Sequence, residues 1–333
     1  MDSGFRRNDG KRGSRPFSDF ILMGFQEYMK RIDLWPFRKK EVSPWTWEGE
    51  SAPAAPPRKP RIVWNIVLFI LTLITTVLAG ALQEGVNPLK DPGQIPRGFP
   101  FALALMGILL AHELGHYLVA RRHGVDVTLP YFIPAPSFIG TFGAFIKMRS
   151  PARDRRMLLD IGAAGPLVGV LVSIPLVVFG LTLSEVKQIE GQVGIHLGDS
   201  LLLWAISELV VGNLPSGYDV VMHPVGFAGW IGLLVTSLNL LPVGQLDGGH
   251  VLYALLGDRQ IKISKFVFVG LLALGVLGWE GWLFWGVLLW IMGFRHPPPL
   301  EWWIPLDRRG KIIGWATMGV FILTFIPVPF SGF

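Results

Sequence analysis

Long apolar runs constrain the fold of this chain more than any other feature of its sequence. A helix of about 20 mostly apolar residues can cross the hydrocarbon core of a membrane, which is about 30 Å thick. The runs cover residues 62–82, 98–120, 157–181, 225–241 with a continuation toward 256, 266–294 and 312–329. Run 266–294 is too long for one crossing and is interrupted by Trp279-Glu280-Gly281-Trp282, so we expect a hairpin of two short spans, with one long tilted helix as the alternative. The sequence therefore predicts an all-α polytopic membrane protein with about seven transmembrane helices.

The composition excludes several other classes of protein. Only 16% of the residues are charged and 51% are hydrophobic, whereas soluble domains carry about 25% charged residues. The chain has no cysteine, which excludes disulfides, iron–sulfur clusters, cysteine-ligated zinc and a cysteine nucleophile. The formal net charge of +6 in so apolar a chain indicates basic loops facing an anionic membrane surface, and we expect no nucleic-acid partner.

The distribution of Lys and Arg predicts the orientation of the spans. Basic residues gather in segments 1–60, 121–122, 149–156, 259–265 and 308–311, and they are sparse in 83–97 and 182–224. The positive-inside rule makes the basic segments cytoplasmic, with the N-terminus inside and the C-terminus outside. We interpret residues 1–60 as a flexible cytoplasmic tail and residues 61–330 as the transmembrane domain. Because the tail contains no evident targeting signal, we expect a prokaryotic plasma membrane rather than an organelle membrane.

Segment 125–148 does not fit a simple crossing, because basic clusters flank it on both sides. Its three prolines, Pro130, Pro134 and Pro136, forbid a continuous helix, and β-forming residues surround them. We expect a re-entrant, β-rich loop. Non-helical backbone at membrane depth is tolerated only where it is buried in protein or lines a wet cavity, so the loop predicts a cavity beside the second and third spans.

The second span contains the pattern His-Glu-x-x-His at His112, Glu113 and His116. Residues four apart lie on one face of a helix, so both imidazoles can reach one ion, and zinc accepts imidazole nitrogen as a ligand. Glu113 can then act as a general base toward a water molecule. An ionisable group at bilayer depth costs about 2.5–3.5 kcal/mol, which a bound ion would compensate. The alternative is a polar helix face that lines a transport pathway.

A catalytic zinc ion usually has three protein ligands, and the third is expected near the end of the fourth span. Asp247 is the strongest candidate, beside Gly248 and Gly249, with Pro242 breaking the helix before it. His250 is a rival ligand. The alternative for Asp247 is a turn-forming Asp-Gly pair at a membrane exit. His296 precedes three prolines, and we expect it in a cytoplasmic linker.

His112–His116 followed by Asn239-x-x-Pro-x-x-x-x-Asp247-Gly248 resembles the site-2 protease family of intramembrane zinc metalloproteases. The resemblance covers residues 98–256 and implies zinc as the cofactor, His112, His116 and Asp247 as its ligands, and Glu113 as the catalytic base. It also implies a catalytic role for Asn239 in substrate or oxyanion binding. The stretch 162–166 is similar to a Gly-Pro segment that packs near the site in this family, and position 169, often Asn in the family, is Gly here. We find no insert long enough for a PDZ domain, so the chain resembles a compact member.

The resemblance further implies regulated proteolysis, in which peptide bonds in or near the membrane span of a single-pass protein are cut. The substrate and the membrane lipid are the expected partners. A substrate helix must unwind before it is cut, and a strand edge can bind the freed backbone. We expect Gly140, Thr141, Phe142 and Gly143 to form this substrate-binding edge, with a tight structural turn as the equal alternative. Two rival functions stay open: a membrane transporter, and a non-catalytic metal-binding membrane protein that uses the same polar residues. The sequence does not indicate an oligomeric state.

Overall fold

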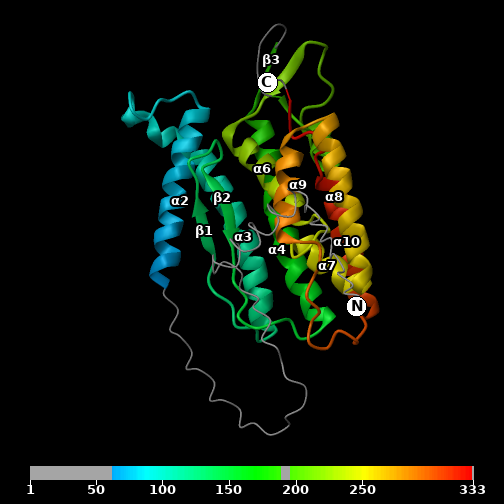
Figure 1. Ribbon diagram of the computed structural model, residues 1–333. Helices are drawn as coiled ribbons and strands as arrows, with labels where there is room; N and C mark the ends of the chain where they lie inside the picture. The colour runs from blue at the N-terminus through cyan, green and yellow to red at the C-terminus, as the bar shows by residue number, and fades with distance from the viewer. Residues whose placement is uncertain (1–61, 189–195, 332–333) are drawn as a thin grey trace, which may run out of the picture. The chain divides into compact units, whose positions relative to one another are not determined.

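The computed structural model describes residues 62–188 and 196–331 (Figure 1). The chain divides into two units, residues 1–58 and 59–333, and only the second is described below. The N-terminal tail predicted for residues 1–60 lies outside the described residues.

The described unit is mostly helical, with three small antiparallel pairs of strands. The α-helices are α2 (Ile62–Gln83), α3 (Phe99–Arg122), α4 (Arg155–Thr182), α5 (Leu201–Val210), α6 (Pro224–Asn239), α7 (Asp247–Leu256), α8 (Gln260–Leu277), α9 (Gly281–Met292) and α10 (Arg308–Thr324), with 3-10 helices η1 (Pro92–Gly98) and η2 (Gly257–Arg259). The strand pairs are β1 (Tyr131–Pro134) with β2 (Thr141–Phe145), β3 (Glu185–Gln188) with β5 (Tyr218–Val221), and β4 (His196–Leu197) with β6 (Phe330–Ser331).

Within residues 62–188 and 196–331, four helical stretches are long and apolar enough to cross a membrane: Ile62–Gln83, Pro92–Arg122, Arg155–Thr182 and Asp247–Leu277. The first three coincide with predicted spans. The fourth predicted span is instead divided, because α6 ends at Asn239 and the chain turns before α7 begins at Asp247. Pro242 lies in that turn, where it cannot continue a helix.

The break predicted within residues 266–294 is confirmed, because α8 ends at Leu277, α9 begins at Gly281, and the two helices pack together. α10 covers most of the last apolar run. It has 17 residues, of which Arg308, Arg309 and Lys311 are charged, and it is not among the four long apolar stretches of the described chain. The four stretches agree with a multi-pass membrane protein.

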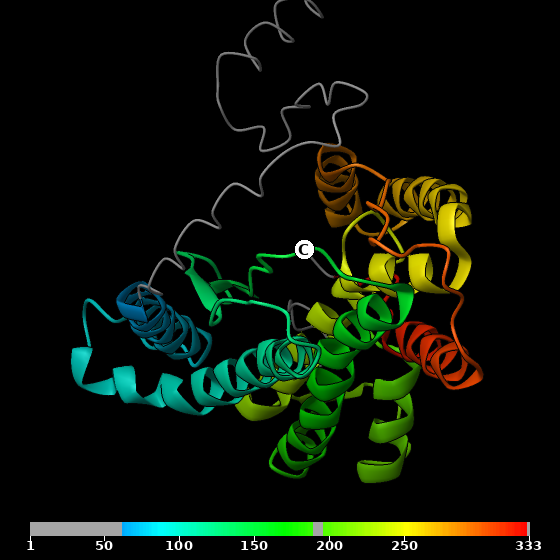
Figure 2. The same ribbon diagram turned by 90° about the horizontal axis from the view of Figure 1, so that it is seen from below.

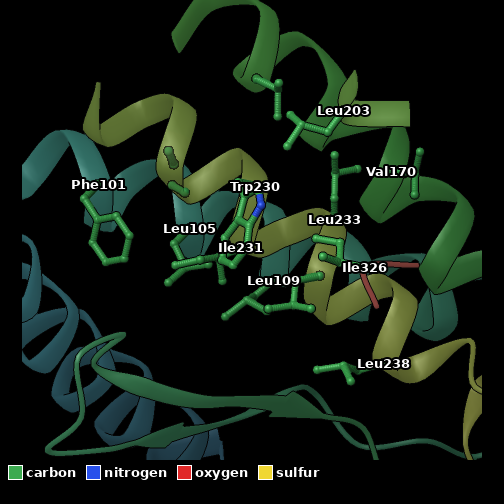
Figure 3. Close-up of a cluster of buried hydrophobic side chains, with 14 of the residues drawn as sticks. Phe101, Leu105, Leu109, Val170, Leu203, Trp230, Ile231, Leu233, Leu238 and Ile326 are labelled. Carbon is green, nitrogen blue, oxygen red and sulfur yellow. The ribbon is translucent and has the colours of Figure 1, made fainter. Parts of the chain in front are cut away.

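Helices α3, α4 and α6 pack against one another and form the centre of the unit. Figure 3 shows part of the apolar cluster between them, which includes Phe101 and Leu105 of α3 and Trp230 of α6, each fully buried. The indole Nε1 of Trp230 donates a hydrogen bond to the Gly198 carbonyl at 2.9 Å, so its one polar atom is satisfied. This cluster fixes α3, which carries the His-Glu-x-x-His pattern.

The segment predicted to be a re-entrant loop forms the β1–β2 hairpin, which lies along α2 (Figures 1 and 2). Polar side chains of α2 hold it in place. The Asn65 amide donates to the Leu129 and Pro130 carbonyls, both at 2.9 Å, and the Thr75 hydroxyl donates to the Gly140 carbonyl at 2.6 Å. The predicted β-rich structure is thus confirmed, and its free carbonyls are satisfied by a neighbouring helix, as apolar surroundings require.

Close contact between α4 and α6 depends on glycine and yields a first prediction. A Cβ atom at Gly180 of α4 would lie 2.1 Å from backbone atoms of Gly226 in α6. We expect Gly180→Val to lower the free energy of unfolding by about 1–3 kcal/mol or more, because overpacking forces the two helices apart. Thermal unfolding of the purified protein in detergent measures the loss.

Gly107 of α3 is the matched control, since no atom lies within 4 Å of a Cβ placed there. Gly107→Ala should leave the unfolding temperature unchanged or raise it slightly. Equal unfolding temperatures for Gly180→Val and the wild type would contradict the packing described here.

Candidate metal centre

Two helices bring the predicted metal ligands together. His112 and His116 lie on one face of α3, with ring centroids 4.9 Å apart. Asp247 is the first residue of α7 and reaches them from the end of the turn that follows α6. Both imidazoles are buried, with 4% and 6% of their surface exposed. Among the described residues, these three form the group of side chains with metal-ligand geometry.

The three ligand atoms form a nearly equilateral triangle. Nε2 of His116 lies 3.2 Å from Nε2 of His112 and 3.2 Å from Oδ2 of Asp247, and Nε2 of His112 lies 3.3 Å from the same oxygen. Ligands at about 2.0–2.1 Å from a tetrahedral zinc ion are separated from one another by about 3.3 Å. The triangle therefore has the dimensions of one face of a zinc coordination tetrahedron.

One arrangement of hydrogens is unfavourable in this triangle. If both imidazoles donated from Nε2 to Asp247, the two Nε2–H groups would face each other at 3.2 Å, donor against donor. In addition, Nδ1 of His116 lies 2.7 Å from the Ile161 carbonyl. Because a carbonyl only accepts, Nδ1 carries the hydrogen, and in the neutral imidazole the lone pair of Nε2 then points into the triangle, as in metal-binding histidines. The donor set fits a zinc ion with an open fourth position.

Glycine residues of α4 make room for the imidazoles. A Cβ atom at Gly165 would lie 2.1 Å from Nε2 of His116, and one at Gly169 would lie 3.0 Å from Nδ1 of His112. The expectation that stretch 162–166 packs near the site is thus confirmed. The position of Gly169 is crowded from a second side, because the Thr236 hydroxyl would also lie 3.0 Å from a Cβ atom there. A larger residue at this position would therefore press on the ligand His112.

The two predicted catalytic side chains lie beside the triangle. Glu113 is 6% exposed, and the backbone of Ile146, just after β2, lies near its carboxylate. Asn239 is the last residue of α6, and its Nδ2 lies 3.4 Å from Nε2 of His112. His250, the rival ligand, lies outside the triangle: its Nδ1 is 2.5 Å from Nε2 of His296.

The predicted substrate-binding residues are divided between a turn and a strand. Gly140 has φ +82° and ends the hairpin turn, where its carbonyl accepts a hydrogen bond from Ala135 N–H. Thr141, Phe142 and Gly143 belong to β2, which pairs with β1 alone in the described chain. Phe142 is 74% exposed. The turn alternative therefore applies to Gly140, whereas the other three residues occupy a strand.

Comparison with protein families matches Peptidase family M50 to residues 100–277, more than half of the chain. The chain belongs to peptidase family M50. The matched range includes all three corners of the triangle as well as Glu113 and Asn239. The resemblance to the site-2 proteases is thus confirmed.

Two similar proteins carry names that agree with this family. The Arabidopsis thaliana protein named "Probable zinc metalloprotease EGY1, chloroplastic" is 33% identical over 247 residues, which are 65% of this chain and 45% of that protein. The Arabidopsis thaliana "Probable zinc metalloprotease EGY2, chloroplastic" is 31% identical over 252 residues, 74% of this chain and 44% of that protein. The chain spans about half the length of these relatives. With zinc metalloprotease relatives and a His-His-Asp cluster, the metal of this M50 protein is zinc.

Sequence reasoning misses the Ile161 carbonyl and the steric role of Gly165 in the centre. It also misses the burial of His296, which the sequence places in a cytoplasmic linker. The first two depend on how α3 crosses α4, which no local pattern encodes. The glycine before Pro166 is the one available signal, since a small residue permits a close approach.

Gly165 gives a direct test of the metal centre. We expect Gly165→Ala to abolish or strongly weaken zinc binding, because a methyl group would occupy the position of the His116 ring. Zinc per chain, measured by elemental analysis of the purified protein, checks this result. Gly107→Ala is again the control and should retain wild-type zinc content, and full zinc content in Gly165→Ala would show that the imidazole has another position available.

Proposed function

We propose that this M50 protein is an intramembrane zinc endopeptidase that hydrolyses peptide bonds within or near the transmembrane segment of single-pass membrane proteins. One observation carries the proposal: a triangle of zinc ligands is buried between apolar helices of membrane-spanning length, with the Glu113 carboxylate beside it. A membrane-anchored segment can reach such a site from the bilayer.

Each polar side chain has a proposed role. His112, His116 and Asp247 hold zinc. When bound, zinc polarises the scissile carbonyl and lowers the pKa of a water molecule. Glu113 accepts the proton of the attacking water at its carboxylate and delivers it to the nitrogen of the leaving amine. The Asn239 amide donates a hydrogen bond to the carbonyl oxygen as negative charge develops there.

The β1–β2 hairpin supplies a means of presenting the substrate. A transmembrane helix satisfies its backbone groups internally, so unwinding one turn exposes donors and acceptors that must find partners. Strand β2 is paired on one side, and Ile146, the residue after its end, lies near the Glu113 carboxylate. An unwound substrate that adds to Thr141–Gly143 would therefore lie next to the base.

The orientation follows from the basic segments. α3 ends in basic segment 121–122, and α4 begins in basic segment 149–156. Segment 149–156 contacts the chain just before α10, because Arg153 pairs with Glu301 at 3.1 Å and Arg156 pairs with Asp307 at 2.8 Å. These contacts support one common side for segments 149–156 and 308–311, and the contact of His123 with Asp160 at 3.1 Å adds the end of α3. We propose that this side is cytoplasmic in a prokaryotic plasma membrane. We further propose that α6, α9 and α10 complete about seven crossings together with the four long stretches.

Glu113 separates catalysis from zinc binding. We expect Glu113→Gln to retain about one zinc per chain, because Glu113 is not a corner of the triangle, and to lower cleavage by at least about 100-fold through loss of the base. Cleavage of a model single-pass substrate in detergent or liposomes, beside elemental analysis of zinc, measures both. Asp247→Ala is the comparison variant and should lose zinc and activity together.

The transporter and the non-catalytic metal-binding protein predict other results. A wild-type protein that holds zinc and cuts no membrane-anchored substrate would favour the non-catalytic alternative. A protein that holds no zinc, with all three ligand atoms intact, would favour a polar transport pathway.

The exposed strand residue Phe142 tests the presentation of the substrate. We expect Phe142→Ala to lower kcat/KM about tenfold or more, chiefly through KM, because its ring offers apolar contact to a bound substrate strand. Phe179→Ala on α4, where the ring is 56% exposed, should leave kcat/KM unchanged. An unaltered kcat/KM in Phe142→Ala, with wild-type zinc content, would remove β2 from the substrate path.

A further inference from the structure

After α9 the chain leaves the helical hairpin at Gly293 and runs to α10. This connection lies outside residues 100–277, the range matched to the M50 family. Its first four residues, Gly293–His296, contact the turn 240–246 and the α7 helix that begins after it at Asp247. We call these four residues the brace. The His296 side chain of the brace reaches α7, the helix that begins with the zinc ligand Asp247.

The brace and the Asp247 turn are in direct backbone contact. A Cβ atom at Gly244, which has φ +55°, would lie 2.4 Å from the Gly293 carbonyl oxygen. α8 connects the same two segments from the other side. The Gln260 amide donates to the Phe294 carbonyl at 3.2 Å, and the Ser264 hydroxyl donates to the Pro242 carbonyl at 2.8 Å. Gln260 also donates to Ser264 at 2.7 Å, and both side chains are fully buried.

His250 and His296 join the brace to α7. Nδ1 of His250 lies 2.5 Å from Nε2 of His296, and the His296 ring stacks on Tyr253 with centroids 4.8 Å apart. His296 is 9% exposed. Burial, followed by the neighbouring His250, lowers the pKa of His296 to about 3. His296 is therefore uncharged at neutral pH, and one imidazole of the pair donates while the other accepts.

Apart from His250, the first turn of α7 has few side chains that could fix the direction of the helix. It reads Asp247-Gly248-Gly249-His250. The two glycines allow backbone contact: a Cβ at Gly248 would lie 1.9 Å from the Leu240 carbonyl oxygen, and one at Gly249 would lie 2.4 Å from that of Gly244. Because the Asp247 side chain faces the metal triangle, His250 is the one side chain in this turn that can anchor it to another segment.

We propose that His296 is a positioning residue for the zinc centre: through its hydrogen bond to His250 it fixes the first turn of α7, and thereby the direction of the Asp247 carboxylate. The inference rests on the proposed role of Asp247 as a zinc ligand, and it adds a residue from outside the matched M50 range. Groups that support a metal ligand through hydrogen bonds typically change metal affinity by about 10–100-fold when they are removed.

The test uses the full-length protein purified in detergent, with zinc affinity measured by competition with a chelator of known affinity. His296→Phe keeps an aromatic ring against Tyr253 and removes the hydrogen bond. We expect it to weaken zinc binding at least about tenfold. His250→Phe should weaken binding to a similar extent, and the double variant should be no weaker than the weaker single variant, because both substitutions break one bond.

Two further variants separate positioning from general stability. His296→Gln places an amide nitrogen near the position of Nε2 and should restore zinc affinity to within about threefold of the wild type. His196→Phe changes an exposed histidine and should leave affinity unchanged. A merely structural role for His296 would lower the unfolding temperature of the zinc-free protein and leave the zinc dissociation constant unchanged, and that result would overturn the proposal.

The other outcomes are also decisive. Additive losses in the double variant would mean that His296 does not act through His250. If His296→Phe does not fold, the proposal stands or falls on the zinc affinities of His250→Phe and His296→Gln. A wild-type protein that binds zinc and cuts nothing would defeat the proposed protease function and leave this inference intact, whereas a wild type that binds no zinc would defeat both.

Discussion

The cost of burying ionisable side chains among apolar helices governs this structure. His112, Glu113 and His116 lie within one span, and Asp247 joins them from a second. Each group is expensive to hold away from water, and the three ligand atoms converge at 3.2–3.3 Å. A bound divalent cation offsets this cost, so the zinc site contributes to this packing as well as to chemistry.

Small residues make the remaining packing possible. Gly165 admits the His116 ring, Gly180 and Gly226 allow α4 to touch α6, and Gly248 lets α7 approach the end of α6. In a lipid environment there is little hydrophobic force between helices, so close backbone contact and interhelical polar bonds carry more of the association. The hydrogen bonds from Asn65 and Thr75 to the β1–β2 hairpin serve the same purpose for a non-helical segment.

Local patterns predict the features that depend on nearby residues. The spacing of His112 and His116 follows from helix periodicity alone, and the apolar runs 62–82, 98–120 and 157–181 match helices almost to the residue. The sequence indicates the division between α6 and α7 less clearly, because Pro242 is its only local signal. The contacts of Ile161 and His296 could not be predicted, because both depend on segments that are distant in sequence and meet only after the helices pack. The zinc ligand Asp247 is found only in combination with the motif on α3.

The ligand set also links the chain across a long distance, since His116 and Asp247 are 131 residues apart. Zinc is therefore a reversible cross-link between α3 and α7, and its binding free energy contributes to folding. Above the dissociation constant, each tenfold rise in free zinc adds about 1.4 kcal/mol to the stability of the folded state. Zinc supply should consequently govern how much folded protein persists in the membrane, and a chelator would act on its lifetime as well as on its activity.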